Sequence, residues 1–303
     1  MTRRSQPVAR PEPLTMVLRG LATLPAMSQS TSQIIAFIGG GNMAGALIGG
    51  LVRAGRASAD ILVIDPDEAQ RAKLQADFGV RTQAAADATL AGAALLVWAV
   101  KPQWFAVAAA PCAAHVAGAL HLSVMAGIRS ETIARACGLA LDAARIVRSM
   151  PNTPALIGRG IAALVATPAV SAAERALVEQ VLAPTGQTLW VDHEADLDAV
   201  TALSGSGPAY VFYFVEAMVA AAVEMGLSAE QGQRLALATF DGATALAAQS
   251  DETPAVLRER VTSKGGTTDA ALQSMQRDAV AASIIRAVWA AQQRAVELGN
   301  EFG

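Results

Sequence analysis

Two segments rich in glycine, serine and threonine contain the residue types that bind small anions. Residues 203–210 read LSGSGPAY and residues 261–268 read VTSKGGTT, and both open onto helical sequence. The first turn of a helix presents unpaired backbone N–H groups and the positive end of the helix dipole, which favour a negative charge. We interpret the two segments as two walls of a pocket for a small carboxylate. The alternative for each is that its small residues only end one helix and cap the next.

A third glycine-rich segment has the pattern of a dinucleotide-binding turn. Residues 39–44 read GGGNMA and match G-x-G-x-x-A between an apolar strand, 33–38, and helical sequence. In this context Gly39 allows the tight turn, Gly41 the close approach of the pyrophosphate, and Ala44 the close packing of helix on strand. A turn that serves packing alone is the alternative. The residues of this turn that we assign to cofactor binding are Gly39, Gly41, Asn42 and Met43.

An acid follows the second apolar strand at the spacing expected for contact with the adenine ribose. Strand 61–64 ends at Asp65, and 65 − 41 = 24 residues separate this acid from Gly41. A carboxylate repels a 2′-phosphate, and no Arg or Lys occurs between Asp65 and Glu68 to offset it. The cofactor is therefore expected to be NAD(P)H, with a slight preference for NADH and with NADPH left open. A turn or N-cap role before Pro66 is the alternative for Asp65.

Two later strand ends are expected at the same edge of the sheet, where ligands of α/β proteins bind. Strand 93–100 runs into Lys101, for which a solvated lysine at a helix start is the alternative. Loop 148–155 contains two prolines, and Asn152 is expected to border the nicotinamide; a rigid turn with an Asx hydrogen bond is the alternative. The residues of the first strand end that we assign to cofactor binding are Ala99, Val100, Lys101 and Pro102.

These residues need a sheet to position them, and the chain of 303 residues is long enough for two domains. Strands and helices alternate up to residue 191, which predicts an α/β fold with a Rossmann-type parallel sheet covered on both faces. We place a dinucleotide-binding domain at 33–192 and an all-helical domain at 193–303. The predicted strands are 33–38, 61–64, 93–100, 119–125, 145–149, 160–166 and 187–191, and the helices between them are 45–54, 67–78, 103–117 and 130–138.

The second half has only helical patterns. Residues 210–223 are apolar almost all round, interrupted by Glu216, so a helix here must be covered on several sides. This half is too thin to bury every such surface, which favours a homodimer through the C-terminal helices. The predicted helices are 197–203, 208–226, 228–249, 253–261, 268–276 and 278–299.

Composition excludes several other classes of protein. The net charge is −3 with no basic stripe, so a nucleic-acid partner is not expected. Cys112 and Cys137 are too few for a disulfide framework, and the three histidines are too isolated for a metal site, which favours a cytoplasmic protein without metal. Residues 102–128 lack Asp, Glu, Lys and Arg, but a proline and two histidines interrupt them. We interpret them as a buried helix and strand rather than a membrane span.

Residues 1–32 differ from the rest of the chain in composition. They contain four arginines and three early prolines, without the continuous apolar stretch of a secretory signal. We expect a disordered extension, and a translation start at Met27 is a second interpretation.

Taken together, these segments resemble the pyrroline-5-carboxylate reductase family. The resemblance covers residues 34 to about 299, and its last two motifs are far more specific than the glycine turn. Lys264 departs from the family pattern, which usually has proline at that position. The motifs are residues 37–44, 99–103, 150–155, 203–210 and 261–268.

The resemblance implies a Rossmann domain, a helical dimerisation domain, active sites completed across the dimer, and dimers that often assemble into decamers. It implies hydride transfer from NAD(P)H to the C=N carbon of 1-pyrroline-5-carboxylate, which gives L-proline. Thr268 is placed near the ring nitrogen as the catalytic residue, and a protonated imine needs orientation rather than a nucleophile or a metal. The residues implied in binding the substrate carboxylate are Ser263, Gly265, Gly266, Thr267 and Thr268.

Two other functions remain as alternatives. One is a hydroxyacid dehydrogenase of the same two-domain plan, whose families use a lysine on the long helix after the Rossmann domain. The lysines of this chain are Lys73, Lys101 and Lys264, and none lies on helix 208–226, which argues against it. The other is a non-catalytic nucleotide-binding protein that senses redox state, which substrate-dependent oxidation of NADH would exclude.

Overall fold

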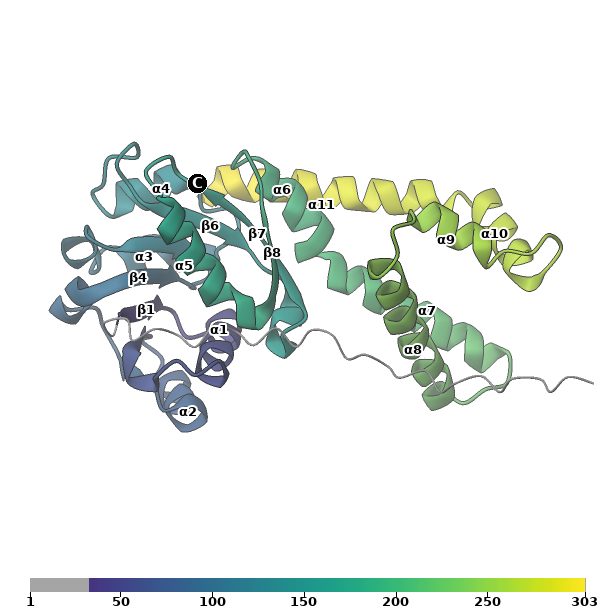
Figure 1. The fold of residues 1–303 in the computed structure, drawn as a ribbon, viewed down its shortest axis with the longest axis horizontal. Coiled ribbons are helices and arrows are strands. Elements are labelled where there is room, and N and C mark those ends of the chain that lie inside the picture. Colours follow the sequence, from purple (N-terminus) through teal and green to yellow (C-terminus); the bar gives the residue numbers. More distant parts are fainter. Residues whose placement is uncertain (1–32, 303) are drawn as a thin grey trace, which may run out of the picture. The chain divides into compact units, whose positions relative to one another are not determined.

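The computed structural model describes residues 33–302. The expectation of a disordered extension at 1–32 therefore lies outside the described residues. Within them, an eight-stranded sheet with helices on both faces is followed by a run of helices (Figure 1). This confirms the expected fold class, a Rossmann-type domain followed by an all-helical part. The boundary near Asp192 falls between the last strand and the first helix of that part, and it stays a prediction.

The strand order is β3-β2-β1-β4-β5-β6-β7-β8. All neighbouring pairs are parallel except β6 and β7, which are antiparallel, so the expectation of a wholly parallel sheet is wrong there. The reason is the short connection, residues 151–159, because a parallel crossover needs a dozen residues or more. The strands are β1 (Ile34–Ile38), β2 (Ile61–Ile64), β3 (Arg81–Gln83), β4 (Ala93–Trp98), β5 (Leu120–Ser123), β6 (Ile146–Met150), β7 (Gly160–Ala166) and β8 (Gly186–Trp190).

Five α-helices connect the strands. The predicted helix 103–117 is wrong, because it is a short helix between two 3-10 turns, Pro102–Trp104 and Ala113–His115. Pro111 explains the break, since it lacks a backbone N–H and clashes with the preceding turn. The helices are α1 (Asn42–Arg53), α2 (Glu68–Phe78), α3 (Phe105–Ala109), α4 (Ser130–Ala136) and α5 (Ala172–Leu182).

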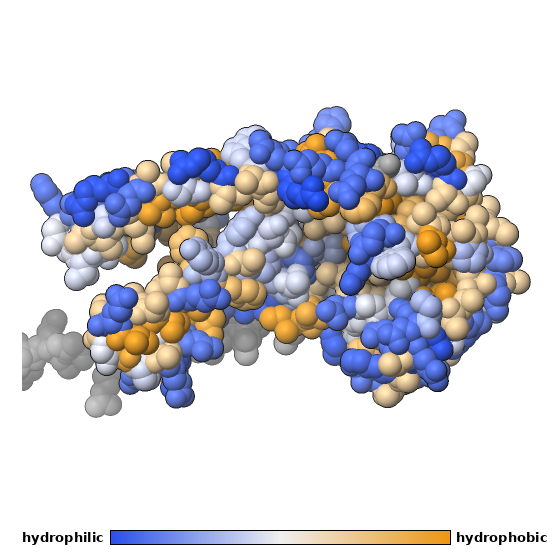
Figure 2. All heavy atoms as spheres, turned by 180° about the vertical axis from the view of Figure 1, so that it is seen from behind, coloured by the Kyte–Doolittle hydropathy of each residue, from blue (hydrophilic) through white to orange (hydrophobic). Residues whose placement is uncertain are grey.

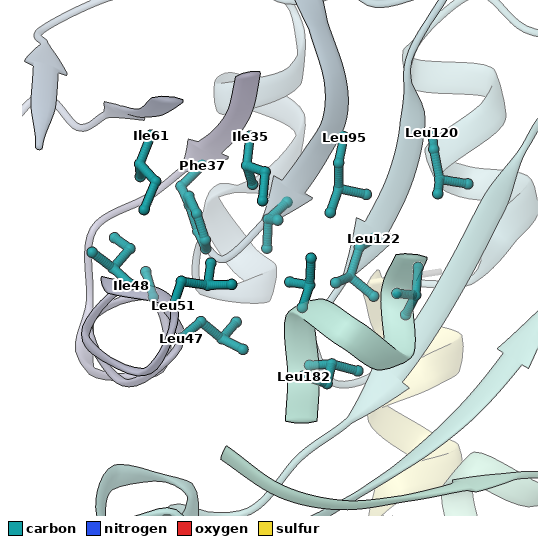
Figure 3. Close-up of a cluster of buried hydrophobic side chains, with 14 of the residues drawn as sticks. Ile35, Phe37, Leu47, Ile48, Leu51, Ile61, Leu95, Leu120, Leu122 and Leu182 are labelled. Carbon is teal, nitrogen blue, oxygen red and sulfur yellow. The ribbon is translucent and has the colours of Figure 1, made fainter. Parts of the chain in front are cut away.

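The core lies on both faces of the sheet. Alternate residues of a strand point to opposite faces, so Phe37 faces one side of β1 and Ile38 the other. On the first face the strands pack against α1 and α5 through residues such as Leu47 and Leu182 (Figure 3). On the second face α3 and α4 cover Trp98 and its neighbours. A sheet buried on both faces holds the strand ends, and the turns that follow them, in fixed positions.

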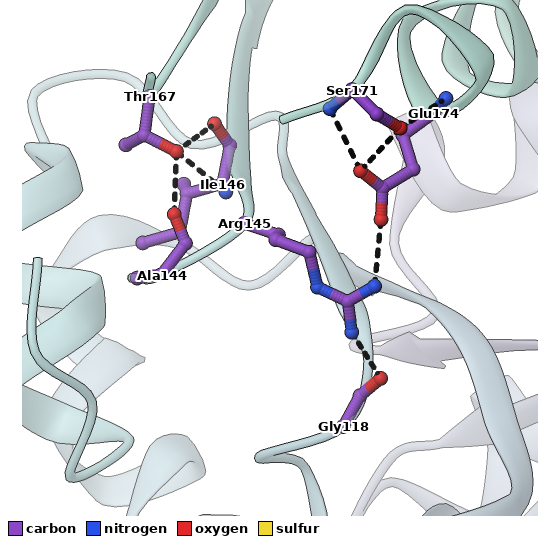
Figure 4. Close-up of polar contacts among 7 residues, drawn as sticks. All are labelled: Gly118, Ala144, Arg145, Ile146, Thr167, Ser171 and Glu174. Atoms are coloured by element: carbon purple, nitrogen blue, oxygen red, sulfur yellow. Dashed lines mark hydrogen bonds and ion pairs between the residues drawn. The ribbon is translucent and has the colours of Figure 1, made fainter. Parts of the chain in front are cut away.

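Polar contacts fix the start of β6, the strand that leads to the loop with Asn152. The Thr167 hydroxyl donates to the Ala144 carbonyl at 2.6 Å and accepts from the Ile146 N–H at 3.1 Å (Figure 4). Arg145 bonds both the Gly118 carbonyl and the carboxylate that completes the capping box of α5. These bonds tie β6 to β5 on one side and to the end of β7 on the other.

The helical part begins with one continuous run. α6 (Asp196–Val200) passes through a π-helical turn (Thr201–Gly205) into α7 (Gly207–Glu224). The end of α11 (Val280–Phe302) returns to the sheet, where Phe302 packs against the core and Gly299 lies beside Arg129. The other helices are α8 (Ala229–Ala248), α9 (Pro254–Arg260) and α10 (Thr267–Arg277).

Large apolar side chains of this part are exposed. Phe212, Tyr213 and Trp289 are 59%, 73% and 61% exposed, and apolar residues gather on the α7 and α8 pair (Figure 2). By length and composition, the run Asp196–Glu224 is also apolar enough to cross a membrane. A face of this kind needs a cover that the single chain does not supply.

Candidate active site

The turn after β1 brings together three of the residues expected to bind the cofactor, namely Gly39, Ala99 and Val100. Gly39 has φ 95°, and its N–H donates to the Ile64 carbonyl at 2.8 Å. A Cβ on Gly39 would lie 2.7 Å from the Ala99 carbonyl oxygen and 2.9 Å from Cγ1 of Val100. Glycine is therefore required here both by the left-handed backbone and by the close approach of the end of β4.

The space in front of α1 is open. A Cβ on Gly41 would meet no protein atom within 4 Å, and no side chain caps the helix. The first-turn N–H groups, including those of Asn42 and Met43, are thus free to bind an anion. Ala44 is buried against the strand, as its position in the motif requires. A dinucleotide pyrophosphate fits this turn.

Asp65 faces the glycine turn from the end of β2. Its Oδ2 accepts the Gly40 N–H at 2.7 Å, and its Oδ1 accepts the Asp67 N–H at 2.9 Å. Asp67, and not Asp65, caps α2, by accepting the Ala69 N–H at 2.9 Å. The bond from Asp67 gives Asp65 the turn role that is its alternative, while the remaining lone pairs of its carboxylate stay available to ribose hydroxyls at the carboxyl end of β2.

Lys101 and Pro102 follow directly after the Ala99 and Val100 pair. Lys101 is exposed, and its carbonyl accepts the Trp104 N–H at 2.9 Å at the start of a 3-10 turn. No side chain caps this turn. The ammonium group of Lys101 is therefore free to meet a phosphate or to remain in water.

Asn152 joins the loop after β6 to the helical run. Its Nδ2 donates to the Ser204 carbonyl at 3.2 Å, and its Oδ1 accepts the Ile161 N–H at 3.0 Å. Beside it, a Cβ on Gly205 would lie 2.7 Å from Cε of Met150, so the π-helical turn packs closely on the end of β6. Both ends of the Asn152 amide therefore have protein partners, and they hold this loop against the helical run.

The expectation that residues 203–210 form a turn that opens a helix is wrong for residues 203–205, which belong to the π-helical turn, although α7 begins at Gly207. The Ser206 N–H donates to the Thr201 carbonyl at 2.8 Å, which is the bonding of a π-helical turn inside a continuous run. The Ser204 hydroxyl is also occupied, because it donates to the Val200 carbonyl at 3.1 Å. The segment therefore presents the side of a helix, packed closely on the end of β6, rather than the start of a helix. Such π-helical turns are frequent at functional sites.

Residues 263–268 do form a turn before a helix. Gly265 has φ 74°, the Gly266 N–H donates to the Ser263 carbonyl at 2.9 Å, and a Cβ on Gly266 would lie 2.6 Å from Oγ of Ser263. The Gly265 N–H donates to Oδ2 of Asp269 at 2.8 Å. α10 begins at Thr267 without a side-chain cap. The donors left for a carboxylate are the N–H groups of the first turn, the Ser263 hydroxyl and the threonine hydroxyls.

Within one chain, this loop does not meet the nucleotide edge of the sheet. α10 packs on α11, and the opposite end of α11 contacts the sheet domain (Figure 1). A helix of 23 residues spans about 34 Å at 1.5 Å per residue. The loop at 263–268 and the nucleotide edge of the sheet are therefore separated in the single chain.

The described residues offer neither a metal site nor an activated thiol. Among residues 33–302, no group of three or more His, Cys, Asp or Glu side chains has an arrangement that could hold a metal ion. Cys112 and Cys137 are fully buried, and burial raises the pKa of their thiols to about 11 and about 12. Both remain protonated near neutral pH.

The glycine turn, the acid after β2 and the open end of α1 define a dinucleotide-binding protein with a Rossmann-type domain. Two family models match: NADP oxidoreductase coenzyme F420-dependent over residues 34–127, and pyrroline-5-carboxylate reductase dimerisation over residues 194–298. The pyrroline-5-carboxylate reductase of Pseudomonas aeruginosa is 43% identical over 270 residues, which cover 89% of this chain and 98% of that protein. The chain belongs to the pyrroline-5-carboxylate reductase family.

Solved structures agree with this assignment. A pyrroline-5-carboxylate reductase from Coxiella burnetii has a TM-score of 0.82 and 32% identity, with 88% of this chain and 99% of that chain covered. The pyrroline carboxylate reductase of Plasmodium falciparum, solved with NADP bound, has a TM-score of 0.78 and 26% identity over 88% of this chain and 98% of that one.

Proposed function

We propose that the chain is an NAD(P)H-dependent pyrroline-5-carboxylate reductase that carries out the last step of proline biosynthesis. It reduces the C=N bond of 1-pyrroline-5-carboxylate to give L-proline. The observation that carries the proposal is 43% identity over nearly the whole length of a pyrroline-5-carboxylate reductase, in a chain with an open dinucleotide turn and an uncapped anion-binding turn. The domain boundary near Asp192 belongs to the same proposal.

The residues at the carboxyl ends of the strands bind the dinucleotide and orient it. Bound NAD(P)H supplies the hydride. The free N–H groups after Gly41 hold the pyrophosphate, Asp65 accepts from the adenine ribose, and the Ala99 to Pro102 segment lines the path toward the nicotinamide. Asn152 keeps the loop after β6 against the helical run, so that the nicotinamide end of the site has a rigid wall.

The carboxylate loop orients the substrate. Ser263 and the N–H groups from Gly265 to Thr268 surround the substrate carboxylate, and the half-buried Thr268 lies at the first turn of α10 beside the ring nitrogen. In the free chain the Gly265 N–H is occupied by Asp269, so substrate binding has to displace that bond or use the remaining donors. The Thr268 hydroxyl keeps a hydrogen bond to the ring nitrogen while the C=N bond becomes a single bond.

A second copy completes the site. Because the loop at 263–268 and the nucleotide edge lie at opposite ends of α11, a homodimer through the C-terminal helices brings the loop of one copy to the sheet of the other. The exposed apolar face of α7 and α8 is then covered by the partner, and the run Asp196–Glu224 is a dimer helix in a cytoplasmic enzyme rather than a membrane span. Further assembly into decamers is part of the proposal.

A steady-state assay tests the function. Pyrroline-5-carboxylate is added to the purified chain with NADH or NADPH, and cofactor oxidation is followed by absorbance. Oxidation that depends on the substrate is expected with both cofactors. Cofactor binding without turnover would support a nucleotide sensor instead, and turnover of 2-hydroxy or 3-hydroxy acids alone would support a hydroxyacid dehydrogenase.

A further inference from the structure

An arginine that lies beyond the β2 turn in sequence is folded back onto that turn. Arg71 occupies the first turns of α2, six residues after Asp65. Its Nη1 donates to the carbonyl oxygens of Asp65 at 2.8 Å and of Pro66 at 2.9 Å. The side chain is half-buried, so its position is fixed against the carboxyl end of β2. This is the part of a Rossmann domain that receives the adenine ribose.

The turn therefore contains both an acid and a fixed cation. The two oxygens of Asp65 already accept N–H groups, from Gly40 and Asp67, which partly offset the charge of the carboxylate. Within residues 33–302, only Nη1 of the Arg71 guanidinium has hydrogen-bond partners. Its Nη2 and Nε groups can donate together to one phosphate, which is the geometry in which arginine binds this group best.

We infer that Arg71 binds the 2′-phosphate of NADPH, so that one adenosine site accepts both cofactors. Asp65 serves the ribose hydroxyls of NADH, and Arg71 offsets the repulsion between Asp65 and the phosphate of NADPH. The inference rests on the proposed use of a nicotinamide dinucleotide, and it adds the residue that reads the phosphate. A purely structural arginine, which only ties the turn to α2, would not distinguish the two cofactors.

Two adenosine fragments separate these roles without any turnover. Binding of 2′,5′-ADP and of 5′-AMP to the full-length protein is measured by isothermal titration calorimetry, for the wild type and for Arg71→Gln. The fragments differ only in the 2′-phosphate. The wild type is expected to bind both fragments, and Arg71→Gln is expected to weaken the binding of 2′,5′-ADP about tenfold or more while the binding of 5′-AMP changes less than about twofold.

Arg81→Gln is the matched control. Nη1 of Arg81 also donates to a backbone carbonyl, that of Ala59 at 3.4 Å. Arg81 lies at the start of β3, however, and so at the amino ends of the strands, away from the nucleotide edge. The Arg81→Gln variant should bind both fragments as tightly as the wild type does. Thermal melts of both variants verify that the domain stays folded.

Three results would overturn the inference: no binding of 2′,5′-ADP by the wild type, equal weakening of both fragments by Arg71→Gln, or no weakening of either. Equal weakening would show that Arg71 stacks on the adenine or only holds the turn. Selective loss of 2′,5′-ADP binding in a protein that fails to reduce pyrroline-5-carboxylate would leave the assignment of Arg71 intact and refute the proposed function alone.

Discussion

Lowering the pH from 7 to 5 should destabilise the protein through His121 on β5. This side chain is fully buried, and its Nδ1 accepts the Trp98 Nε1–H at 3.1 Å, with the two rings stacked 6.1 Å apart. Burial lowers the pKa of His121 from 6.5 to about 4; the backbone of Val116 acts in the opposite direction, and the charge of Arg145 adds to the lowering. The native state therefore keeps this histidine neutral, while the unfolded chain protonates it near its ordinary pKa.

The sign and the size follow from proton linkage. Between pH 6.5 and 4 the unfolded state binds more protons than the native state, so stability falls as the pH falls through this range. The full effect is about 3 kcal/mol, and about 2 kcal/mol of it should be lost between pH 7 and pH 5. Above the pKa of His121 in the unfolded state, both states hold this histidine neutral, so burial of the neutral imidazole costs no stability there.

Urea unfolding at a fixed protein concentration measures this effect. His121→Asn keeps an acceptor for the Trp98 indole but removes the titration, so its free energy of unfolding should fall less steeply with pH than that of the wild type. His193→Gln, a change at an exposed histidine, should follow the wild-type curve. Parallel curves for the wild type and His121→Asn between pH 7 and 5 would refute a buried neutral histidine at this position.

Three further predictions concern the site and the join between the domains. In steady-state kinetics, Ser263→Ala should raise KM more than it lowers kcat. Thr268→Ala should lower kcat, with a rise of about 1–3 kcal/mol in the activation free energy, and Thr268→Ser should restore most of the lost kcat. NADH should be used at least as well as NADPH, and Asp65→Ala should shift the kcat/KM ratio toward NADPH; a wild type that prefers NADPH more than about tenfold would contradict the role of Asp65. Glu194 accepts from the Ser130 N–H and hydroxyl at 2.7 Å and from buried Arg148 at 3.0 Å. Because Glu194→Gln leaves the buried charge of Arg148 without its partner, it should lower the free energy of unfolding in urea by about 3 kcal/mol, and a loss below about 1 kcal/mol would contradict this role of Glu194.

Local patterns predicted the parts of this molecule that depend on local physics. Apolar residues indicate the positions of the buried strands β1, β2, β4, β5, β6 and β7, whereas the three residues of β3 have no apolar pattern. The glycine turn was recognisable because Gly39 and Gly41 are required by backbone geometry and by open space. The break at Pro111 was recognisable in principle, but the alanine-rich sequence around it favoured one longer helix.

The features that sequence patterns missed depend on contacts between distant residues. The antiparallel direction of β7 follows from the length of its connection, and the π-helical turn at 201–205 follows from its packing on Met150 and Asn152. Arg71 lies beyond the interval from Asp65 to Glu68, and only the structure shows that α2 returns its side chain to the turn after β2. The separation of the loop at 263–268 from the sheet depends on the whole length of α11, so only the structure could reveal it.

The amount of L-proline formed per cofactor oxidised tests the central claim most directly. Purified protein is incubated with pyrroline-5-carboxylate and a limiting amount of NADPH or NADH, and the product is quantified by chiral chromatography with mass detection. We predict one L-proline for each cofactor oxidised when the L-enantiomer of pyrroline-5-carboxylate is supplied. Cofactor binding without L-proline, or cofactor oxidation that leaves pyrroline-5-carboxylate unconsumed, would contradict the assignment.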